Sequence, residues 1–315
     1  MTMLSRTADH LYWMSRYTER AENIARMLEV SYRMSLQTPG SQPGYWGAAL
    51  GINGLEEAYR SKYGAITAGN VLRFMSVDLD NPSSILACLR AARENCHAVR
   101  GTVTSEVWET VNTTWLEARD SVQSLPQGSI QGSELTKYFE WVKFRSHLSR
   151  GVTVGTMLQD EAFHFIRLGT FLERADNTAR LLDVKFDELA PPSSADGEYY
   201  EWSALLRSVS AFEIYRKVYR DMITPQRVAE LLILREDMPR SLHACLKEVH
   251  QILGLIANLR SQETLRRAGA MYSRLRYGRI EDIAARGLHA VLTDFLDDTA
   301  DLGNRIAQDF LLPVS

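Results

Sequence analysis

Two stretches of this sequence repeat each other. Residues 17–30 read YTERAENIARMLEV, and residues 171–184 read FLERADNTARLLDV. The same offset of 154 residues aligns His10 with His164 without a gap. Solenoid repeats are much shorter, at roughly 20–45 residues, so the pattern indicates two large copies of one folding unit.

The repeat continues downstream with small shifts. Residues 82–90 read PSSILACLR, and residues 239–247 read PRSLHACLK. The chain is therefore interpreted as two tandem copies of a unit of about 155 residues, at 1–155 and 156–315. Two equal copies favour a pseudo-two-fold arrangement, which is the intramolecular form of a symmetric dimer.

Apolar residues recur at spacings of three and four, and strand-like alternation is absent, so the fold class is all-α, a helical bundle. Segments rich in Pro and Gly separate the expected helices. Only residues 151–155 (GVTVG) could be extended. The helices are expected at 4–36, 55–75, 83–100, 104–124, 133–150, 160–189, 201–219, 225–236, 240–258, 260–277 and 280–309.

Composition excludes several classes of protein. The net charge of −3 gives no electrostatic case for binding nucleic acid or anionic lipid. No apolar run approaches the ~18 residues of a membrane span. The charged first helix argues against a signal peptide. Three cysteines form no disulfide framework, and the matched Cys88 and Cys245 are expected to be small buried residues. We expect a soluble cytoplasmic protein.

A polar stripe on the repeated helix is the candidate site. Ala21, Ile24 and Leu28 lie on the opposite face, with Ala175 and Leu182 in the second copy, and are expected in the core. Apolar residues bracket the stripe in the second copy, which indicates partial burial. The stripe comprises Glu19, Asn23 and Arg26, then Glu173, Asn177 and Arg180, with Arg20 and Arg174 at its shoulder.

Three interpretations of this stripe stay open, and structural pairing is favoured. Buried charges must be paired, so Glu19 could face Arg180 while Glu173 faces Arg26 across the two copies. Removing one partner would then cost about 3–5 kcal/mol, and the double charge reversal of Glu19 and Arg180 would recover much of it. Alternatively, the stripe binds an amino acid or peptide terminus. A metal is least favoured, because neither glutamate has the Glu-x-x-His spacing of di-metal bundles.

A second basic feature repeats every seven residues, at Arg260, Arg267 and Arg274. Such a row could bind an acidic chain or phosphate. We favour a solvated face that the acidic last helix neutralises, with Asp298 and Asp301 among its carboxylates. The sequence contains no phosphate-binding glycine loop, nucleophile elbow or HExxH motif, so no cofactor is predicted.

The duplicated Glu19-Arg20 and Glu173-Arg174 pairs, in an all-helical chain, resemble the alpha-E family, a bacterial helical domain named for its Glu-Arg motif. Other supporting motifs follow in order along the whole chain, among them residues 92–95 (AREN), 105–108 (SEVW), 202–205 (WSAL) and 238–241 (MPRS).

The resemblance implies a setting rather than a reaction. It places the chain in a peptide synthesis or modification system with ATP-grasp ligases, transglutaminase-like proteins and an NTN-hydrolase-type peptidase. The first interpretation is an accessory scaffold whose partner is the ATP-grasp ligase or the transglutaminase-like protein. The second is an enzyme that uses Glu19 or Glu173 as general base and an arginine as carboxylate clamp. The third is a metal-binding helical bundle.

Overall fold

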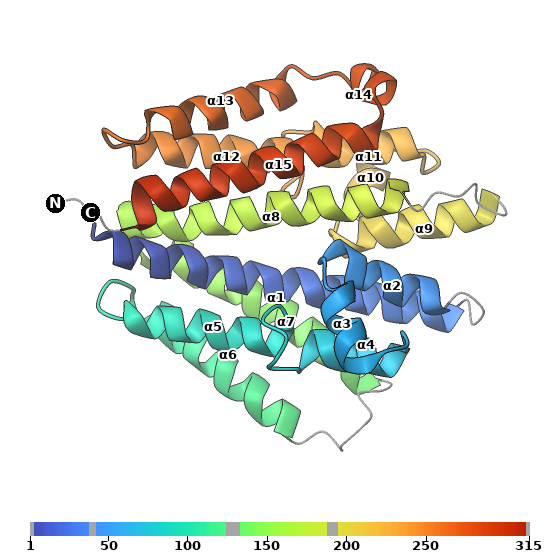
Figure 1. Cartoon of the computed structure of the whole chain (residues 1–315), viewed down its shortest axis with the longest axis horizontal. Coiled ribbons are helices and arrows are strands. Elements are labelled where there is room, and N and C mark those ends of the chain that lie inside the picture. The colour runs from blue at the N-terminus through green and yellow to red at the C-terminus, as the bar shows by residue number, and fades with distance from the viewer. Residues whose placement is uncertain (1–2, 38–41, 124–132, 188–194, 313–315) are drawn as a thin grey trace. The chain divides into compact units, whose positions relative to one another are not determined.

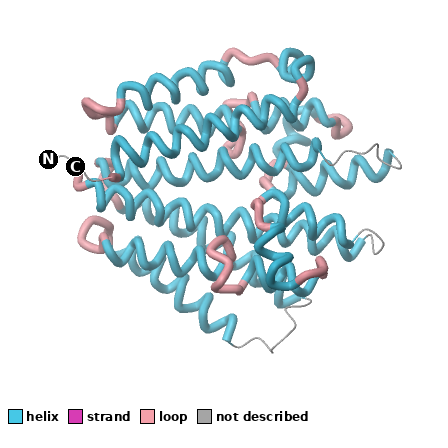
Figure 2. The backbone as a smooth tube through the Cα atoms, in the orientation of Figure 1, coloured by secondary structure: helices cyan, strands magenta, loops and turns pink. Residues whose placement is uncertain are grey.

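The computed structural model describes residues 3–37, 42–123, 133–187 and 195–312. Every regular element in this part of the chain is a helix, and no strand occurs in it (Figure 2). The all-α prediction is therefore confirmed. The chain divides into two compact units, residues 1–170 with 311–315, and residues 171–310.

Four long helices form most of the first unit. In Figure 1, α1 lies against α5 and α7, α6 packs on both α5 and α7, and the short helices α2, α3 and α4 gather near one end of α1. The helices are α1 (Ser5–Gln37), α2 (Gln42–Ile52), α3 (Glu56–Tyr63), α4 (Ala68–Ser76), α5 (Ile85–Ala98), α6 (Ser105–Gln123) and α7 (Ser133–Thr156).

The second unit has a similar order of long and short helices. Its helix α12 packs on α13, α13 packs on α15, and the short α14 contacts both α11 and α15. Helix α8 begins in the first unit and ends in the second. The helices are α8 (Glu161–Asp187), α9 (Ala195–Ser208), α10 (Phe212–Tyr219), α11 (Pro225–Ile233), α12 (Leu242–Leu255), α13 (Gln262–Arg276), α14 (Ile280–Arg286) and α15 (Leu288–Ile306), with a π-helical turn at Ala307–Leu311.

The apolar faces of the repeated helix are buried as predicted. In α1, Ala21, Ile24 and Leu28 are at most 1 % exposed, and in α8 Ala175 and Leu182 are fully buried. Helical spacing places these residues on one side, so each turn removes one more apolar side chain from water.

A buried tyrosine organises the same turn in both units. The Tyr59 hydroxyl donates to the Ala65 carbonyl at 3.1 Å and accepts from the Thr67 amide. In the second unit, the Tyr215 hydroxyl donates to the Met222 carbonyl at 2.9 Å and accepts from the Thr224 amide. In each unit the threonine is also the N-cap of the next helix. One phenol therefore holds the turn between two short helices.

The following helix also begins alike in the two units. Ser84 caps α5 by accepting from the Ala87 amide, and Ser241 caps α12 by accepting from the Ala244 amide. A serine oxygen at this position satisfies one of the amides that a helix start leaves without a partner. Both Cys88 and Cys245 are buried and outside any disulfide, as predicted.

Several predicted helices are interrupted by residues with positive φ. The segment 55–75 is broken after α3 by Gly64 at φ 69°, and 201–219 is broken between α9 and α10, where Ser210 has φ 55°. The segment 280–309 is split at Gly287, where φ is 90°. Positive φ lies outside the right-handed helical region, so it ends a helix whatever the apolar spacing suggests.

Residues 151–155 are helical, and the expectation of an extended segment is wrong. Helix α7 continues to Thr156, and its late threonines donate to the carbonyls four residues earlier, Thr153 to Ser149 at 2.8 Å and Thr156 to Val152 at 2.7 Å. The boundary between the two compact units falls inside α8, between residues 170 and 171. The predicted boundary between the two copies falls between residues 155 and 156. The assignment of domains from the repeat therefore stays a prediction.

Candidate functional site

Two glutamates of the repeated helix are completely buried in the first unit. Glu19 and Glu22 are each 0 % exposed and lie one turn apart on α1. Helix α7 lies against α1. Its Ser146 and Arg150 supply hydrogen bonds to these glutamates.

Donors from both α1 and α7 engage the Glu22 carboxylate. Its Oε1 accepts from Arg26 Nε at 2.8 Å, and its Oε2 accepts from Ser146 Oγ at 2.7 Å. Arg150 Nη1 lies 2.6 Å from the same Oε2. Both carboxylate oxygens are therefore engaged, which compensates for the cost of burying the charge.

Arg150 joins the two carboxylates. Its Nη1 donates to Glu19 Oε2 at 2.9 Å as well as contacting Glu22, and it also donates to Ser146 Oγ. Its side chain is 26 % exposed, so the charged network reaches the surface on the α7 side.

His147 covers the outer side of the same cluster. Its Nδ1 lies 2.7 Å from Arg150 Nη2, and its Nε2 lies 3.1 Å from Arg26 Nη2. A neutral imidazole has one acceptor nitrogen, and guanidinium groups only donate, so at most one of these contacts is a hydrogen bond. The His147 side chain is 56 % exposed and is the most accessible member of the cluster.

Another ion-paired carboxylate lies one turn beyond Arg26 on α1. The Glu29 carboxylate accepts from Arg33 at 2.6 Å and pairs with Lys143 of α7. On α7, Lys143, Ser146, His147 and Arg150 follow a spacing of three, one and three residues, which keeps them on one side of a helix. We call the set Glu19, Glu22, Arg26, Ser146, His147 and Arg150 the α1–α7 cluster.

The rest of the predicted stripe in the first unit is buried or half-buried. Asn23 and Arg26 are 5 % and 8 % exposed, so partial burial is confirmed there. Arg20, at the shoulder, is half-buried, and its guanidinium lies 5.6 Å from the centre of the Tyr17 ring.

The stripe of the second unit differs in its burial and in its partners. Glu173 and Arg174 are buried, and Arg174 donates to the Pro239 carbonyl at 3.4 Å while lying over the Phe171 ring. Asn177 is half-buried and Arg180 is exposed. Arg180 pairs with Asp176, one turn away on α8, at 2.8 Å.

A family model described as a predicted alpha-helical domain with a conserved ER motif matches residues 3–311. The chain belongs to the Alpha-E family. The predicted resemblance is thus confirmed, and the two Glu-Arg pairs described above stand at the starts of the repeated stretches.

Curated relatives of this Alpha-E chain carry no functional description. Uncharacterized proteins from Mycobacterium tuberculosis and Mycobacterium bovis are each 25 % identical over 316 residues, which covers 92 % of this chain. The chain spans about a third of the length of these relatives, 35 % in each case. No solved structure matches the chain. Among the described helices, none has the length and apolar character needed to cross a membrane.

The sequence pointed to only part of the α1–α7 cluster. Glu22 flanks the predicted stripe at about 60° around the helix, so its burial could have been inferred. Ser146, His147 and Arg150 gave no signal, because they lie more than a hundred residues from α1 in the sequence. The pairing of Glu19 with Arg180 and of Glu173 with Arg26 stays a prediction.

The cluster is built to hold charge rather than to expose it. A general base must reach the proton that it removes, and neither Glu19 nor Glu22 has exposed surface. In the part of the chain that the structure describes, no group of three or more His, Cys, Asp or Glu residues could hold a metal ion. Burial raises the pKa of the Cys96 thiol to about 12, so this cysteine is not a thiolate at neutral pH.

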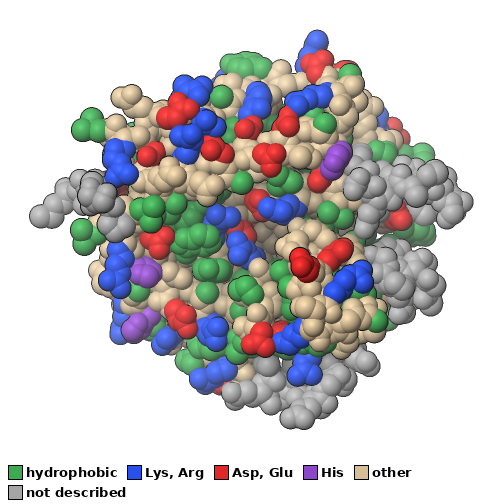
Figure 3. Space-filling model, viewed as in Figure 1, with side chains coloured by type: hydrophobic (Ala, Val, Ile, Leu, Met, Phe, Trp, Pro, Cys, Tyr) green, Lys and Arg blue, Asp and Glu red, His purple; other side chains and the backbone are tan. Residues whose placement is uncertain are grey.

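Two arginines of the basic row lie on α13 and are neutralised by the last long helix, as predicted, whereas Arg260 precedes α13 and donates to the Gln308 carbonyl at 2.7 Å. Arg267 pairs with Asp301 at 2.7 Å, and Arg274 pairs with Asp298. Figure 3 shows blue and red side chains interspersed over this face. Paired charges of both signs leave no continuous basic surface for an acidic chain.

Proposed function

We propose that this Alpha-E chain is an accessory component, without catalytic activity of its own, of a bacterial peptide synthesis or modification system. Its partner would be an ATP-grasp-type amide ligase or a transglutaminase-like protein of that system. The observation that carries the proposal is the burial of Glu19 and Glu22 among donors from α7. Glu19, the glutamate of the first Glu-Arg pair, thereby serves a rigid helical framework in the first unit.

This burial weighs against the enzymatic alternative. A base and a carboxylate clamp must contact substrate, yet the two candidate bases are buried, Glu19 at 0 % and Glu173 at 5 % exposed. The metal-binding alternative would need carboxylates or imidazoles that converge on one point, whereas Glu19 and Glu22 converge on a guanidinium.

We also infer that the two halves descend from one duplicated unit. The shared tyrosine turns at Tyr59 and Tyr215 support this, as do the matched caps at Ser84 and Ser241. These devices recur at offsets of 156 and 157 residues, close to the 154 of the opening stretch. A pseudo-two-fold arrangement of the copies belongs to the same proposal.

A cytoplasmic location is part of the proposal. The three cysteines lie in the described part of the chain and are outside any disulfide, and a reducing compartment keeps thiols reduced. The mycobacterial relatives support a bacterial setting.

The test is an affinity purification of the tagged full chain from its host, with the tag alone as control. We expect enrichment of an ATP-grasp ligase or transglutaminase-like protein. Adding the purified chain should then change the rate of ATP-dependent amide formation by the isolated ligase. Absence of enrichment together with an unchanged ligase rate would overturn the accessory role.

Variants separate this role from catalysis. Glu173→Gln should change the ligase rate as much as the unchanged chain does, provided that the variant is folded. Circular dichroism measures whether it is folded. An amide-forming or hydrolytic activity of the chain alone, lost in folded Glu173→Gln and Glu19→Gln, would support the enzymatic alternative instead.

A further inference from the structure

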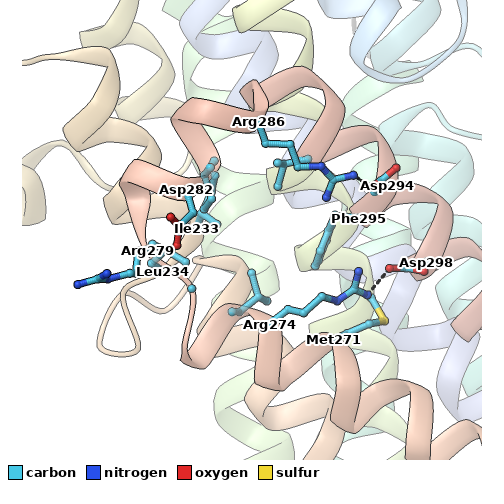
Figure 4. Close-up of a pocket in the computed structure, with 14 residues that line it drawn as sticks. Ile233, Leu234, Met271, Arg274, Arg279, Asp282, Arg286, Asp294, Phe295 and Asp298 are labelled. Atoms are coloured by element: carbon cyan, nitrogen blue, oxygen red, sulfur yellow. Dashed lines mark hydrogen bonds and ion pairs between the residues drawn. The ribbon is translucent and has the colours of Figure 1, made fainter.

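The second unit contains a pocket whose lining includes no residue of the Glu-Arg stripes. Helices α11, α13, α14 and α15 line an open pocket of about 220 Å³ (Figure 4). Sites for drug-sized molecules occupy roughly 300–1,000 Å³, so the size of this cavity suits a smaller molecule.

The inner surface of the pocket is apolar. Ile233 of α11, Met271 and Leu275 of α13 and Phe295 of α15 line it, and each is at most 9 % exposed. In Figure 4, the Phe295 ring projects into the space between Arg286 and Arg274. These side chains would exclude water from an apolar group of the ligand.

Charged side chains of both signs line the opening. Arg274 of α13 pairs with Asp298, and Arg286 of α14 pairs with Asp294, as Figure 4 shows. Asp282 also lines the pocket, and within the described residues it forms no ion pair. Each guanidinium has five N–H donors, so pairing with one aspartate leaves donors for a ligand carboxylate.

The arginines and aspartates at the pocket opening favour a ligand that has charges of both signs. With Arg279, the lining holds three arginines and three aspartates, so a plain anion or a plain cation would meet as many like charges as opposite ones. A molecule with one carboxylate and one ammonium can place each beside its opposite, the first near Arg274 or Arg286 and the second near the aspartates.

Helix α14, which forms part of the pocket wall, has few buried contacts with the rest of the unit. None of its residues is buried, and the Arg286 pair with Asp294 joins it to α15. Gly287 has φ 90° and follows it directly. An element with few buried contacts opens at low free-energy cost, which gives a small ligand a route into the pocket.

We infer that the pocket between α11, α13, α14 and α15 binds a zwitterion with an apolar side chain, a free hydrophobic α-amino acid. This inference rests on the lining of the pocket alone and does not depend on the accessory role.

Isothermal titration of the purified full chain with L-leucine, L-methionine and L-phenylalanine tests the inference. Saturable binding of at least one of them is expected. Isopentylamine and 4-methylpentanoate each lack one charge of leucine, and glycine lacks the side chain. Each of the three should bind at least about tenfold more weakly than leucine, because it loses a charge-assisted pair or the apolar contact.

Two exposed positions locate the site. Arg274→Gln and Asp282→Asn should weaken binding about tenfold or more, since each removes one charge from the opening. Arg266→Gln is the matched control, because Arg266 lies on the same helix, is exposed and pairs with Glu263 instead. It should bind as the unchanged protein does.

Three results would overturn the inference. These are no saturable binding of any of the three amino acids at millimolar concentration, binding of the amine or acid analogue as tight as that of leucine, or equal binding by Arg274→Gln, Asp282→Asn and Arg266→Gln. The purified chain is used without a ligase, so failure here is distinct from failure of the accessory role.

Discussion

The two copies of the repeated helix contain the same ion pair in different surroundings. Glu22 and Arg26 of α1 are separated by four residues, as are Asp176 and Arg180 of α8. The side chains of the first pair are 0 % and 9 % exposed, and those of the second are 22 % and 44 % exposed. Similar local sequence therefore produces a buried network in one place and a half-exposed pair in the other.

The difference comes from a neighbouring helix. On α7, Ser146 and Arg150 supply donors that satisfy Glu22 within the protein. A buried carboxylate with several donors differs in consequence from a surface pair, because solvent cannot replace a donor that is lost. The contribution of this ion pair to stability thus depends on the side chains of the helix packed against it.

The largest expected effect tests this contrast directly. Glu22→Gln removes the charge that Arg26 and Arg150 share, so the free energy of unfolding should fall by about 3–5 kcal/mol. Asp176→Asn, the matched change in the second copy, should cost less than about 1 kcal/mol. Urea unfolding followed by circular dichroism measures both, and equal losses would contradict the contrast.

A second comparison concerns Ser15 and Gly169, which the repeat aligns. A Cβ on Gly169 would stand 2.3 Å from both the Tyr12 carbonyl oxygen and Ser15 Oγ. Gly169→Ala should therefore destabilise the fold by about 1–3 kcal/mol through overpacking.

Gly155→Ala is the control, because nothing lies within 4 Å of a Cβ there and the residue is helical. This change should stabilise by about 0.5–1 kcal/mol, the ordinary gain of alanine over glycine in a helix. A loss at Gly155 as large as that at Gly169 would show that the close approach to α1 is unimportant.

Where the two units look alike, their energetics should agree. Tyr59→Phe and Tyr215→Phe each remove one hydroxyl that donates to a carbonyl and accepts from an amide. Both tyrosines are fully buried, so each change should lower the free energy of unfolding by about 1–3 kcal/mol. Losses that differ by more than about 1 kcal/mol would show that the two turns are not equivalent.

The smallest effect is a pH dependence at His164. Burial, and secondarily the nearby Arg167, lowers the pKa of His164 below its ordinary value of about 6.5. The unfolded chain therefore takes up this proton at a higher pH than the folded chain. The stability contribution is present above about pH 6.5 and is lost as the pH falls through the lower, folded value.

Replacing His164 with Gln should reduce the loss of stability between about pH 7.5 and pH 5, as measured by thermal unfolding across that range. Arg167→Gln should reduce it partly, because only the smaller cause is removed. An unchanged pH profile in His164→Gln would show that other groups account for the acid sensitivity.

Local pattern predicted much of the helical framework. The spacing of Ala21, Ile24 and Leu28 identified the buried face of α1, and the helices expected at 83–100 and 240–258 match α5 and α12 closely. Breaks at Gly64 and Gly287 were missed, since a glycine can occupy helical or positive φ and its neighbours decide which.

The sequence by itself determined the all-helical class, the repeat, the family and the polar stripe, because helical periodicity and repetition are local properties that can be read along the chain. Only the tertiary structure decided which carboxylates are buried and what satisfies them. Arg150 meets Glu19 across 131 positions of sequence, and the pocket beside Phe295 needs four helices at once. Such contacts depend on how helices pack, and the spacing within one helix contains no information about its neighbour.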